Sequence, residues 1–522
     1  MPHSKENSLF SVIYIGSHAL NMRIVEAENG FISTIEQLRK PIWLGRDTFA
    51  MGKISYDSVA EVCDILLGFK KKLQEYSICN YKIIATSALR EASNRAYIIE
   101  QIRLRTGFAV NVLDNSEERF ISLKALGIMM EGFSEIKNQG TVIVDIGFGS
   151  VQVSIYLKGK LNVSYNIRLG SLRVREVLSD IEGKTINYHK ILEEYIASNI
   201  DGLTIHKVQN ISKNFIALGG EIRLISSICR KKNKDTNDNY INKKDFEDLY
   251  NELLYKSPKM IAKDYGISED SAEILLPAMM MFKKFLDITS SEIIYSPSVS
   301  LIDGIILDMT GVNKQNGNDE VFEKDILDNA IFIAQRYRYN RAHSEDVEKK
   351  ALLLFDKLNR LHGLGLRERF LLQLAAVFHD IGKYVDLNLH HVHSYDLIKA
   401  SNILGLSSGE LEIVANVARY HSTYIPSMED YNYKSLDLTD RIQVSKLSAI
   451  LRLADALDRS HKQKINDIKI VLEDDGVKFV INTSQDILLE QWSFEKKADF
   501  FKEVYGITPY LKYRRLIGNE ER

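Results

Sequence analysis

The sequence predicts a duplicated α/β half, followed by a helical domain and a small α+β module at the end. Two similar strand–turn–strand segments at 9–25 and 141–157 predict the duplication. A stretch at 311–320, rich in Gly, Asn and Asp, separates this half from a purely helical pattern. Alternating residues around an Asp-Asp-Gly turn at 468–484 predict a terminal hairpin.

Each duplicated segment opens with an almost continuously apolar strand, as expected for a central strand covered on both faces. Between them, 81–91 predicts a further strand leading into a helix, which is typical of α/β folds. We therefore expect two α/β domains, 1–135 and 136–310. A stretch at 231–244, rich in Lys and Asn, predicts a surface excursion within the second.

The helical half shows apolar residues at i, i+3 and i+4, for example in 347–361 and 367–381. This spacing predicts a helical domain over 321–466. The alternating pattern beyond it predicts a separate module over 467–522.

Composition excludes several classes of protein. The 522 residues exceed what a single hydrophobic core usually supports, and 45% hydrophobic with 26% charged residues is typical of a globular protein. Since no apolar run is long enough to span a membrane and the start lacks a signal-peptide layout, we expect a cytoplasmic protein without a membrane partner. A net charge of −2 without a long basic stripe argues against duplex nucleic acid as a partner. Three widely spaced cysteines exclude a disulfide framework and a thiolate zinc site.

Glycine turns follow the buried strands of both copies. Glycine allows close approach of the backbone to a ligand, and successive N–H groups in such a turn form a concavity that binds anions. One such turn alone is typical of a tight hairpin, but matching turns in both copies favour a divided phosphate site. The candidate phosphate-binding residues at the glycine turns are Gly16, Ser17, Gly147, Gly149, Ser150, Gly219 and Gly220.

Asp145 directly precedes the second glycine turn. A phosphate would repel this carboxylate unless a cation lay between them, which points to Mg²⁺. The alternative is an aspartate that only stabilises the turn.

Seven short motifs follow one another along the α/β half of the chain: IGS at 15–17, ATSALREASN at 85–94, SEERF at 116–120, VDIGFGS at 144–150, RLGSLRV at 168–174, LGGEIR at 218–223 and SLIDGI at 300–305. In this order they resemble the exopolyphosphatase and guanosine pentaphosphate phosphohydrolase (Ppx/GppA) family of the actin-like ATPase superfamily. The resemblance implies an actin-like (ribonuclease H-like) fold for the two α/β domains. The helical half resembles the HD-type extension of long members, so the likeness covers nearly the whole chain.

The resemblance also implies roles for individual residues. Glu118 matches the general base that acts on water, with Glu117 as its neighbour. Arg90 and the turn amides would hold phosphate, and Asp145 would hold Mg²⁺. By residue type alone, the glutamate pair is typical of the first turn of a helix. The implied substrate is inorganic polyphosphate, with guanosine pentaphosphate as an alternative that the sequence does not separate, and the implied assembly is a homodimer.

The chain departs from the family pattern near these motifs. Tyr14 replaces an aspartate and His18 an asparagine, while Phe148 stands for the middle glycine of the second turn and Gln152 for a glutamate. Asp114-Asn115 stands where the family has serine-glycine. Two carboxylates are therefore missing. An active site, a site altered in substrate and a non-catalytic nucleotide or polyphosphate sensor all stay open as interpretations.

The helical half contains the order H…HD…H…H…D, which resembles the signature of HD phosphohydrolases. Imidazoles combined with carboxylates suit Mn²⁺ or another divalent transition metal better than Mg²⁺ alone. Such an ion can lower the pKa of bound water to about 7. Among the histidines at 390–393 we select the last, because it precedes Ser-Tyr at the start of a helical pattern. Histidines satisfied within a helical core are one alternative. A metal-dependent HD phosphohydrolase that acts on a nucleotide, with the first half serving only as a sensor, is the other. The candidate ligands are His343, His379, Asp380, His393, His421 and Asp455.

Overall fold

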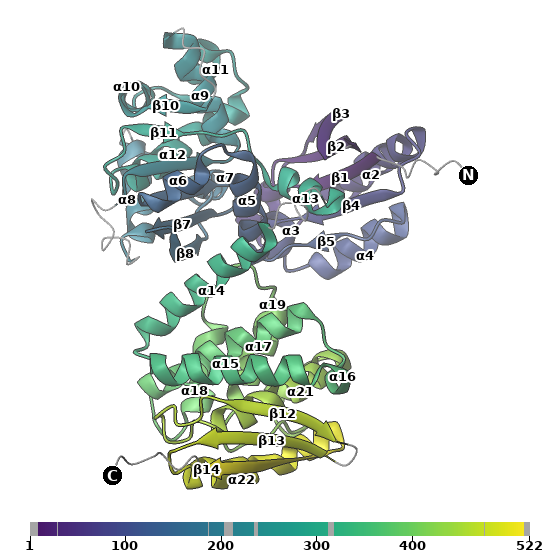
Figure 1. Cartoon of the computed structure of the whole chain (residues 1–522). Coiled ribbons are helices and arrows are strands. Elements are labelled where there is room, and N and C mark those ends of the chain that lie inside the picture. Colours follow the sequence, from purple (N-terminus) through teal and green to yellow (C-terminus); the bar gives the residue numbers. More distant parts are fainter. Residues whose placement is uncertain are drawn as a thin grey trace. The chain divides into compact units, whose positions relative to one another are not determined.

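The computed structural model describes residues 9–28, 30–185, 187–202, 212–233, 239–311, 318–473 and 476–515. It divides into two compact units, Met1–Ile326 and Leu327–Arg522 (Figure 1). This division falls shortly after the stretch 311–320 that we predicted as a linker, of which 312–317 lie outside the described residues. The four domain ranges given above stay predictions.

The first sheet of the first unit has the strand order β3-β2-β1-β4-β5. β1 (Leu9–Ile15) and β2 (Ala19–Glu28) form the predicted hairpin, and β3 (Phe31–Pro41) continues it antiparallel. β4 (Asn80–Ala85) and the short β5 (Asn111–Val112) run parallel to β1. β1 therefore lies in the middle of the sheet, which explains its continuous apolar pattern.

The second sheet repeats this arrangement, with the order β10-β11-β9-β6-β7-β8. Its antiparallel strands are β6 (Thr141–Ile146), β7 (Val151–Leu157) and β8 (Lys160–Ile167). β9 (Asn214–Leu218) and β11 (Ile293–Tyr295) run parallel to β6, so all five strands match β1 to β5 in order and direction. The duplication predicted from the two hairpins is thus visible in both sheets.

An additional strand, β10 (Tyr240–Asn242), extends the second sheet antiparallel to β11. It lies within 231–244, where we expected only a surface excursion. Three residues in a polar setting give too short a pattern to predict a strand, and pairing with β11 supplies the missing stabilisation.

Helices pack against both sheets. α2 (Tyr56–Glu75) begins where Ser55 accepts a hydrogen bond from the Ser58 N–H, and it buries Val62, Leu66 and other apolar residues at helical spacing. The remaining helices of this unit are α1 (Leu44–Met51), α3 (Ser87–Glu91), α4 (Arg95–Thr106), α5 (Asn115–Met129), α6 (Phe133–Asn138), α7 (Ser171–Leu178), α8 (Tyr188–Ile200), α9 (Gly220–Asn233), α10 (Lys243–Leu253), α11 (Pro258–Tyr265), α12 (Glu269–Leu286) and α13 (Leu301–Thr310).

Residues 318–456 form helices throughout, apart from turns and one short 3-10 segment. α14 (Asn318–Arg336) spans the division between the two units. The others are α15 (Arg341–Lys357), α16 (Asn359–His362), α17 (Leu366–Phe378), the 3-10 helix η3 (Ile381–Tyr384), α18 (His390–Lys399), α19 (Ser408–Arg419), α20 (Tyr431–Lys434) and α21 (Leu438–Ala456).

The chain then forms a three-stranded sheet with one helix. β12 (Ile468–Glu473) and β13 (Gly476–Thr483) are the predicted hairpin, and 474–475 in its turn lie outside the described residues. α22 (Leu488–Tyr505) follows, and β14 (Thr508–Arg515) pairs parallel with β13.

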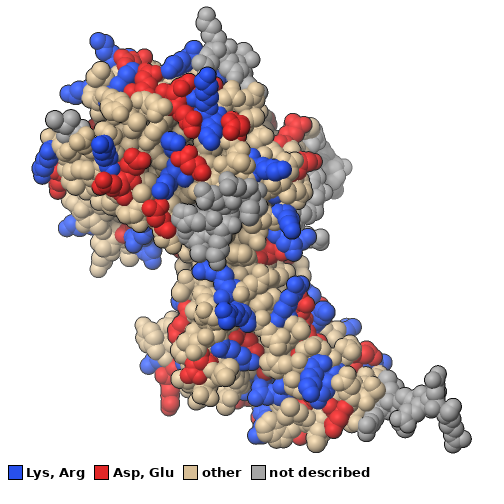
Figure 2. Space-filling view, turned by 90° about the vertical axis from the view of Figure 1, so that its left-hand side faces the viewer, with Lys and Arg blue, Asp and Glu red and all other residues tan. Residues whose placement is uncertain are grey.

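Among the described residues, no helix combines the length and the hydropathy that crossing a membrane requires. Acidic and basic side chains are interspersed over the face drawn in Figure 2, in keeping with the net charge of −2.

Candidate functional site

The two predicted glycine turns have the same backbone geometry. In the first, the Gly16 N–H donates to the Ala19 carbonyl at 3.0 Å; in the second, the Gly147 N–H donates to the Ser150 carbonyl at 2.9 Å. Each turn joins a central strand to its antiparallel neighbour. The structure thus places the two predicted phosphate turns at equivalent points of the duplicated sheets.

Ser87, at the start of α3, connects the two turns. Its Oγ lies 3.0 Å from the Ser17 Oγ, and a Cβ added to Gly149 would lie 2.6 Å from it. The Phe148 ring of the second turn lies 4.8 Å from the His18 ring of the first, between centroids. The two turns therefore meet within the first unit.

The third glycine motif reaches the same region. Gly219 has a φ of +117°, and a Cβ there would lie 2.3 Å from the Ile146 carbonyl and 3.6 Å from Asp145 Oδ1. Only glycine tolerates both this φ and this approach. Gly219 and Gly220 thus bring the start of α9 beside the end of β6.

Arg90 and Glu118 form a nearly buried ion pair. Arg90 Nη1 donates to Glu118 Oε2 at 2.9 Å and to the Leu113 carbonyl at 2.6 Å. Its Nε and Nη2 are buried without a hydrogen-bond partner. Leaving buried guanidinium donors unpaired is costly, so Arg90 retains the capacity to bind an anion.

Glu117 is engaged elsewhere. Its Oε2 accepts a hydrogen bond from the Asp114 N–H at 2.9 Å, as part of a capping box at the start of α5. The adjacent glutamates thus differ in placement: Glu117 caps a helix, whereas Glu118 pairs with the candidate phosphate-binding arginine.

Acidic side chains gather near Asp145. Burial, followed by the charges of Glu118 and Glu221, raises the pKa of Asp145 to about 7. Glu221, in the first turn of α9, accepts a hydrogen bond from Ser171 Oγ, while its buried Oε2 has no partner. Gln152, opposite Asp145 on β7, also has a buried oxygen without a donor. The charge of Arg223 offsets only part of the rise in the pKa of Asp145. Carboxylate and amide oxygens that gather in a buried place fit a hard cation such as Mg²⁺.

Glu221 was not among our candidates. It directly follows the Gly219-Gly220 pair, so the motif contained a signal for it. The structure adds that Glu221 lies in the first turn of α9, near enough for its charge to raise the pKa of Asp145.

Two departures from the family pattern place neutral groups in this region. The Tyr14 hydroxyl lies 3.0 Å from Thr86 Oγ1, and burial raises the pKa of Tyr14, so the phenol stays neutral. Burial and the charge of Arg39 lower the pKa of His18 to about 4, so this imidazole is also neutral. Neither replaces the missing carboxylate.

A cluster of imidazoles and carboxylates is buried in the second unit. His343 Nε2 and His379 Nε2 lie 3.2 Å apart, and both are near Asp380 Oδ2, at 3.7 and 3.6 Å. His390 Nε2 and His421 Nε2 lie 3.3 Å apart, and each is 3.6 Å from Asp380 Oδ1. Each oxygen of Asp380 therefore faces one pair of imidazoles.

Each of the four imidazoles contacts, through its Nδ1, a carbonyl or carboxylate oxygen outside the cluster. The Nδ1 contacts are His379 to the Ala376 carbonyl at 2.7 Å, His421 to the Ala418 carbonyl at 2.6 Å, His390 to the Leu387 carbonyl at 3.0 Å and His343 to Asp458 Oδ2 at 2.8 Å. In His379, His421 and His390 the partner is a carbonyl, which only accepts, so Nδ1 carries the proton and the neutral ring directs a lone pair inward from Nε2. At His343, whose partner is a carboxylate, a bound ion would take the place of a proton on Nε2. Metal-binding histidines use the same outer contacts. Lone pairs that face one another fit bound cations.

The structure corrects one candidate ligand, because His390 belongs to this cluster where we had selected His393. His390 is the first residue of α18 and lies beside Asp380 and His421, whereas His393 follows one turn later on the helix. The helix begins three residues earlier than the Ser-Tyr cue suggested.

The charges in the cluster favour a cation. Despite burial, hydrogen bonds to Asp455 and Asp458 raise the pKa of His343 to about 9, whereas burial lowers that of His421 to about 3. Neighbouring positive groups hold the pKa of Asp380 and of Asp455 well below the usual value, against the effect of burial. Both carboxylates are therefore charged and able to bind a metal.

Asp455 also has a partner that the sequence analysis missed. Lys497 of α22 donates to Asp455 Oδ2 at 2.6 Å and to the His421 carbonyl at 3.0 Å. The second oxygen of this carboxylate, Asp455 Oδ1, lies 3.3 Å from His343 Nε2.

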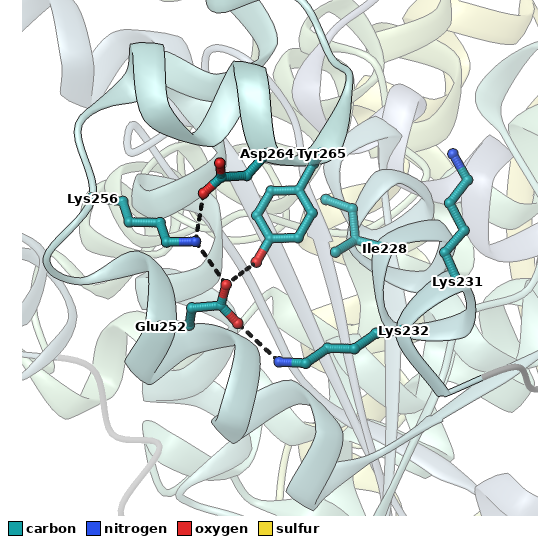
Figure 3. Close-up of a pocket in the computed structure, with 7 residues that line it drawn as sticks. All are labelled: Ile228, Lys231, Lys232, Glu252, Lys256, Asp264 and Tyr265. Carbon is teal, nitrogen blue, oxygen red and sulfur yellow. Dashed lines mark hydrogen bonds and ion pairs between the residues drawn. The ribbon is translucent and has the colours of Figure 1, made fainter.

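A separate cavity of about 540 Å³ lies in the first unit, away from these motifs (Figure 3). Glu252 accepts hydrogen bonds from Lys232 at 2.8 Å, Lys256 at 2.7 Å and Tyr265 at 2.6 Å, and Lys256 also donates to Asp264. The positive and negative side chains that line this cavity largely compensate one another, so we assign no ligand to it.

Comparison with known families matches residues 23–312, more than half of the chain, to the Ppx/GppA phosphatase family. Residues 329–497 match Ppx/GppA phosphatase, domain III. The first match contains Arg90, Glu118, Asp145 and Glu221, and the second contains the whole imidazole cluster.

The chain is similar to curated proteins along most of its length. It is 21% identical to guanosine-5′-triphosphate,3′-diphosphate pyrophosphatase of Aliivibrio fischeri over 483 residues, 89% of each chain. It is 22% identical to the protein of that name from Pseudoalteromonas translucida, covering 80% of this chain and 81% of the relative. Among solved structures, an exopolyphosphatase from Cytophaga hutchinsonii aligns with a TM-score of 0.51 and 19% identity, over 58% of this chain and 98% of that one. This last likeness concerns the fold.

Proposed function

Because the chain belongs to the Ppx/GppA phosphatase family, a group of hydrolases that act on phosphoanhydride bonds, we propose that its first unit removes terminal phosphates from inorganic polyphosphate and releases orthophosphate. Hydrolysis of the 5′ γ-phosphate of guanosine pentaphosphate is the alternative, and the comparisons favour the two substrates equally. The observation that carries the proposal is Arg90, which has unpartnered donors and is paired with Glu118 beside the glycine turns.

In this proposal each group has one task. The amides of the Gly16 and Gly147 turns and the guanidinium of Arg90 bind phosphate oxygens. Glu118, oriented by Arg90, accepts a proton from the attacking water. Mg²⁺ held by Asp145, Glu221 and the Gln152 oxygen would supply positive charge toward the phosphoryl oxygens. A cytoplasmic homodimer, expected from the sequence and the family resemblance, is also part of the proposal.

The test is phosphate release from long-chain polyphosphate and from guanosine pentaphosphate with Mg²⁺ or Mn²⁺. E118Q keeps the shape of Glu118 but removes the base, so we expect kcat to fall about 10²- to 10⁴-fold. E117Q is the matched control, because glutamine also serves in a capping box and should retain most activity. Equal losses in both variants would refute Glu118 as the base. No release by wild type would favour a sensor over an enzyme.

For the second unit, we propose a centre of divalent transition-metal ions, Mn²⁺ or a related ion. Two groups of ligands, His343 with His379 and His390 with His421, share the carboxylate of Asp380. Asp455 completes the first group. The inward-facing lone pairs carry this proposal, since imidazole nitrogen suits such ions. Calorimetric titration of the metal-free full chain with Mn²⁺ tests it, and absence of high-affinity binding would refute it.

A further inference from the structure

The imidazole cluster opens into a pocket of about 440 Å³. This volume falls within the range of small-molecule sites. The pocket is lined by Asp380, Lys383, Leu387, His390, His421, Ser422, Asp455, Arg459, His461, Leu489 and Trp492. Two of these residues, Leu489 and Trp492, belong to α22, so they lie outside the helices of residues 318–456.

Two basic side chains in the lining suit an anion. Lys383 forms an ion pair with Asp380, and the exposed Arg459 lines the same space. Lys497 already compensates the charge of Asp455. With divalent ions on the cluster, positive charge would exceed negative charge here, so a phosphate group would bind there.

The lining also includes apolar side chains that are partly exposed. Leu387 is 73% exposed, Leu489 45% and Trp492 49%. Lys496 Nζ lies 4.0 Å from the centre of the Trp492 ring, so one face of the indole is covered by a neighbour on the same helix. Exposed apolar side chains that line a concave, charged site are typical of ligand contacts.

We propose that α22 makes this pocket a site for a phosphate compound with a flat aromatic end, as in a nucleotide: the phosphate lies toward the ions, Lys383 and Arg459, and the aromatic group contacts Trp492 and Leu489. The inference rests on the metal centre proposed above. It goes beyond that centre by naming the substrate class and the residues that select it. Lys497 acts as a positioning residue, because it holds Asp455 Oδ2 and leaves Oδ1 toward the imidazoles.

The test uses the Mn²⁺-loaded full chain with four probes: inorganic phosphate, ribose 5-phosphate, AMP and GMP. Stacking of a base on an aromatic side chain is worth about 1–3 kcal/mol, so the nucleotides should bind at least about fivefold more tightly than ribose 5-phosphate. W492A should remove this difference and leave phosphate and Mn²⁺ binding unchanged. Y431A, which removes an aromatic residue that is 85% exposed and does not line the pocket, is the matched control.

Fluorescence locates the binding event. The chain has two tryptophans, so in a W43F background the emission comes from Trp492 alone. Quenching of that emission by GMP, lost in an H379A/D380A background, supports the site. Nucleotides that bind no more tightly than ribose 5-phosphate, or that bind W492A equally well, would overturn the inference while the metal centre stands. Failure to bind Mn²⁺ would overturn both, without bearing on the first unit.

Discussion

The first unit builds its candidate site from oxygen donors, whereas the second unit builds its own from imidazoles. Around Asp145 the possible ligands are carboxylates and one amide, which suit Mg²⁺. Around Asp380 they are four imidazole nitrogens and two carboxylates, which suit transition metals. The comparison teaches that one chain can carry two candidate metal sites whose donor atoms suit different ions.

The two sites also differ in how far they depart from the patterns they resemble. In the first unit, Tyr14 and Gln152 replace carboxylates, and the structure leaves the Gln152 oxygen without a donor. In the second unit each position of H…HD…H…H…D is filled once His390 takes the place of His393. The second unit therefore departs less from the pattern it resembles than the first unit does.

The largest expected effect separates the two sites outright. H379A/D380A removes ligands from both metal groups, so Mn²⁺ affinity of the second unit should fall by more than about a hundredfold, beyond the loss typical of an outer-shell change. Calorimetric titration measures this. Phosphate release dependent on Glu118 should continue. If release is lost together with Mn²⁺ binding, the two sites work as one and the comparison fails.

A smaller effect sharpens the oxygen-donor site. Q152E restores a carboxylate opposite Asp145, so Mg²⁺ should bind about tenfold more tightly, because ligand charge sets the affinity for hard cations. Without metal, the added buried charge should lower the melting temperature. Q152L, which removes the acceptor oxygen, should weaken Mg²⁺ binding. Melting curves with and without Mg²⁺ give both readouts, and equal Mg²⁺ stabilisation of all three proteins would exclude Gln152 from the site.

The smallest effect concerns the charged cavity of Figure 3, which serves as a reference away from both sites. Hydrogen bonds from Lys232, Lys256 and Tyr265 lower the pKa of Glu252 from 4.5 to about 2. Because the folded pKa is lowered, this contribution to stability is present above pH 4.5 and disappears as the pH falls toward 2. E252Q should thus cost less than about 1 kcal/mol of unfolding free energy at pH 7, given its solvent exposure. Denaturant unfolding at pH 7 and at low pH checks this. A change in phosphate release or Mn²⁺ binding would contradict the separation.

Much of the fold follows from local patterns. The buried strands and glycine turns predict the duplicated sheets, because a central strand and a tight turn each leave a short-range signal. β10 and β14 leave little signal, since three residues or a late parallel strand depend on partners elsewhere in the sheet. Their formation is decided by tertiary pairing rather than by propensity.

The candidate sites show the same difference between what local sequence patterns predict and what depends on tertiary contacts. Motifs locate Arg90, Glu118 and Asp145, and the structure adds how their side chains are engaged. The structure distinguishes Glu117 from Glu118, because Glu117 accepts a hydrogen bond from the Asp114 backbone and Glu118 pairs with Arg90. The contribution of Lys497 leaves no local pattern, because this residue lies 42 positions from Asp455 in the sequence and reaches it only through the packing of α22.

The bond between Lys497 and Asp455 has a consequence for the order in which the protein is made. The two residues are 42 positions apart, and His343 is 115 positions from its partner Asp458. During synthesis the first histidines therefore emerge well before the groups that orient and compensate them. A metal ion captured at that stage would meet an unfinished ligand set, so we expect selective loading of this centre to follow translation of α22 rather than accompany translation of α15 and α17.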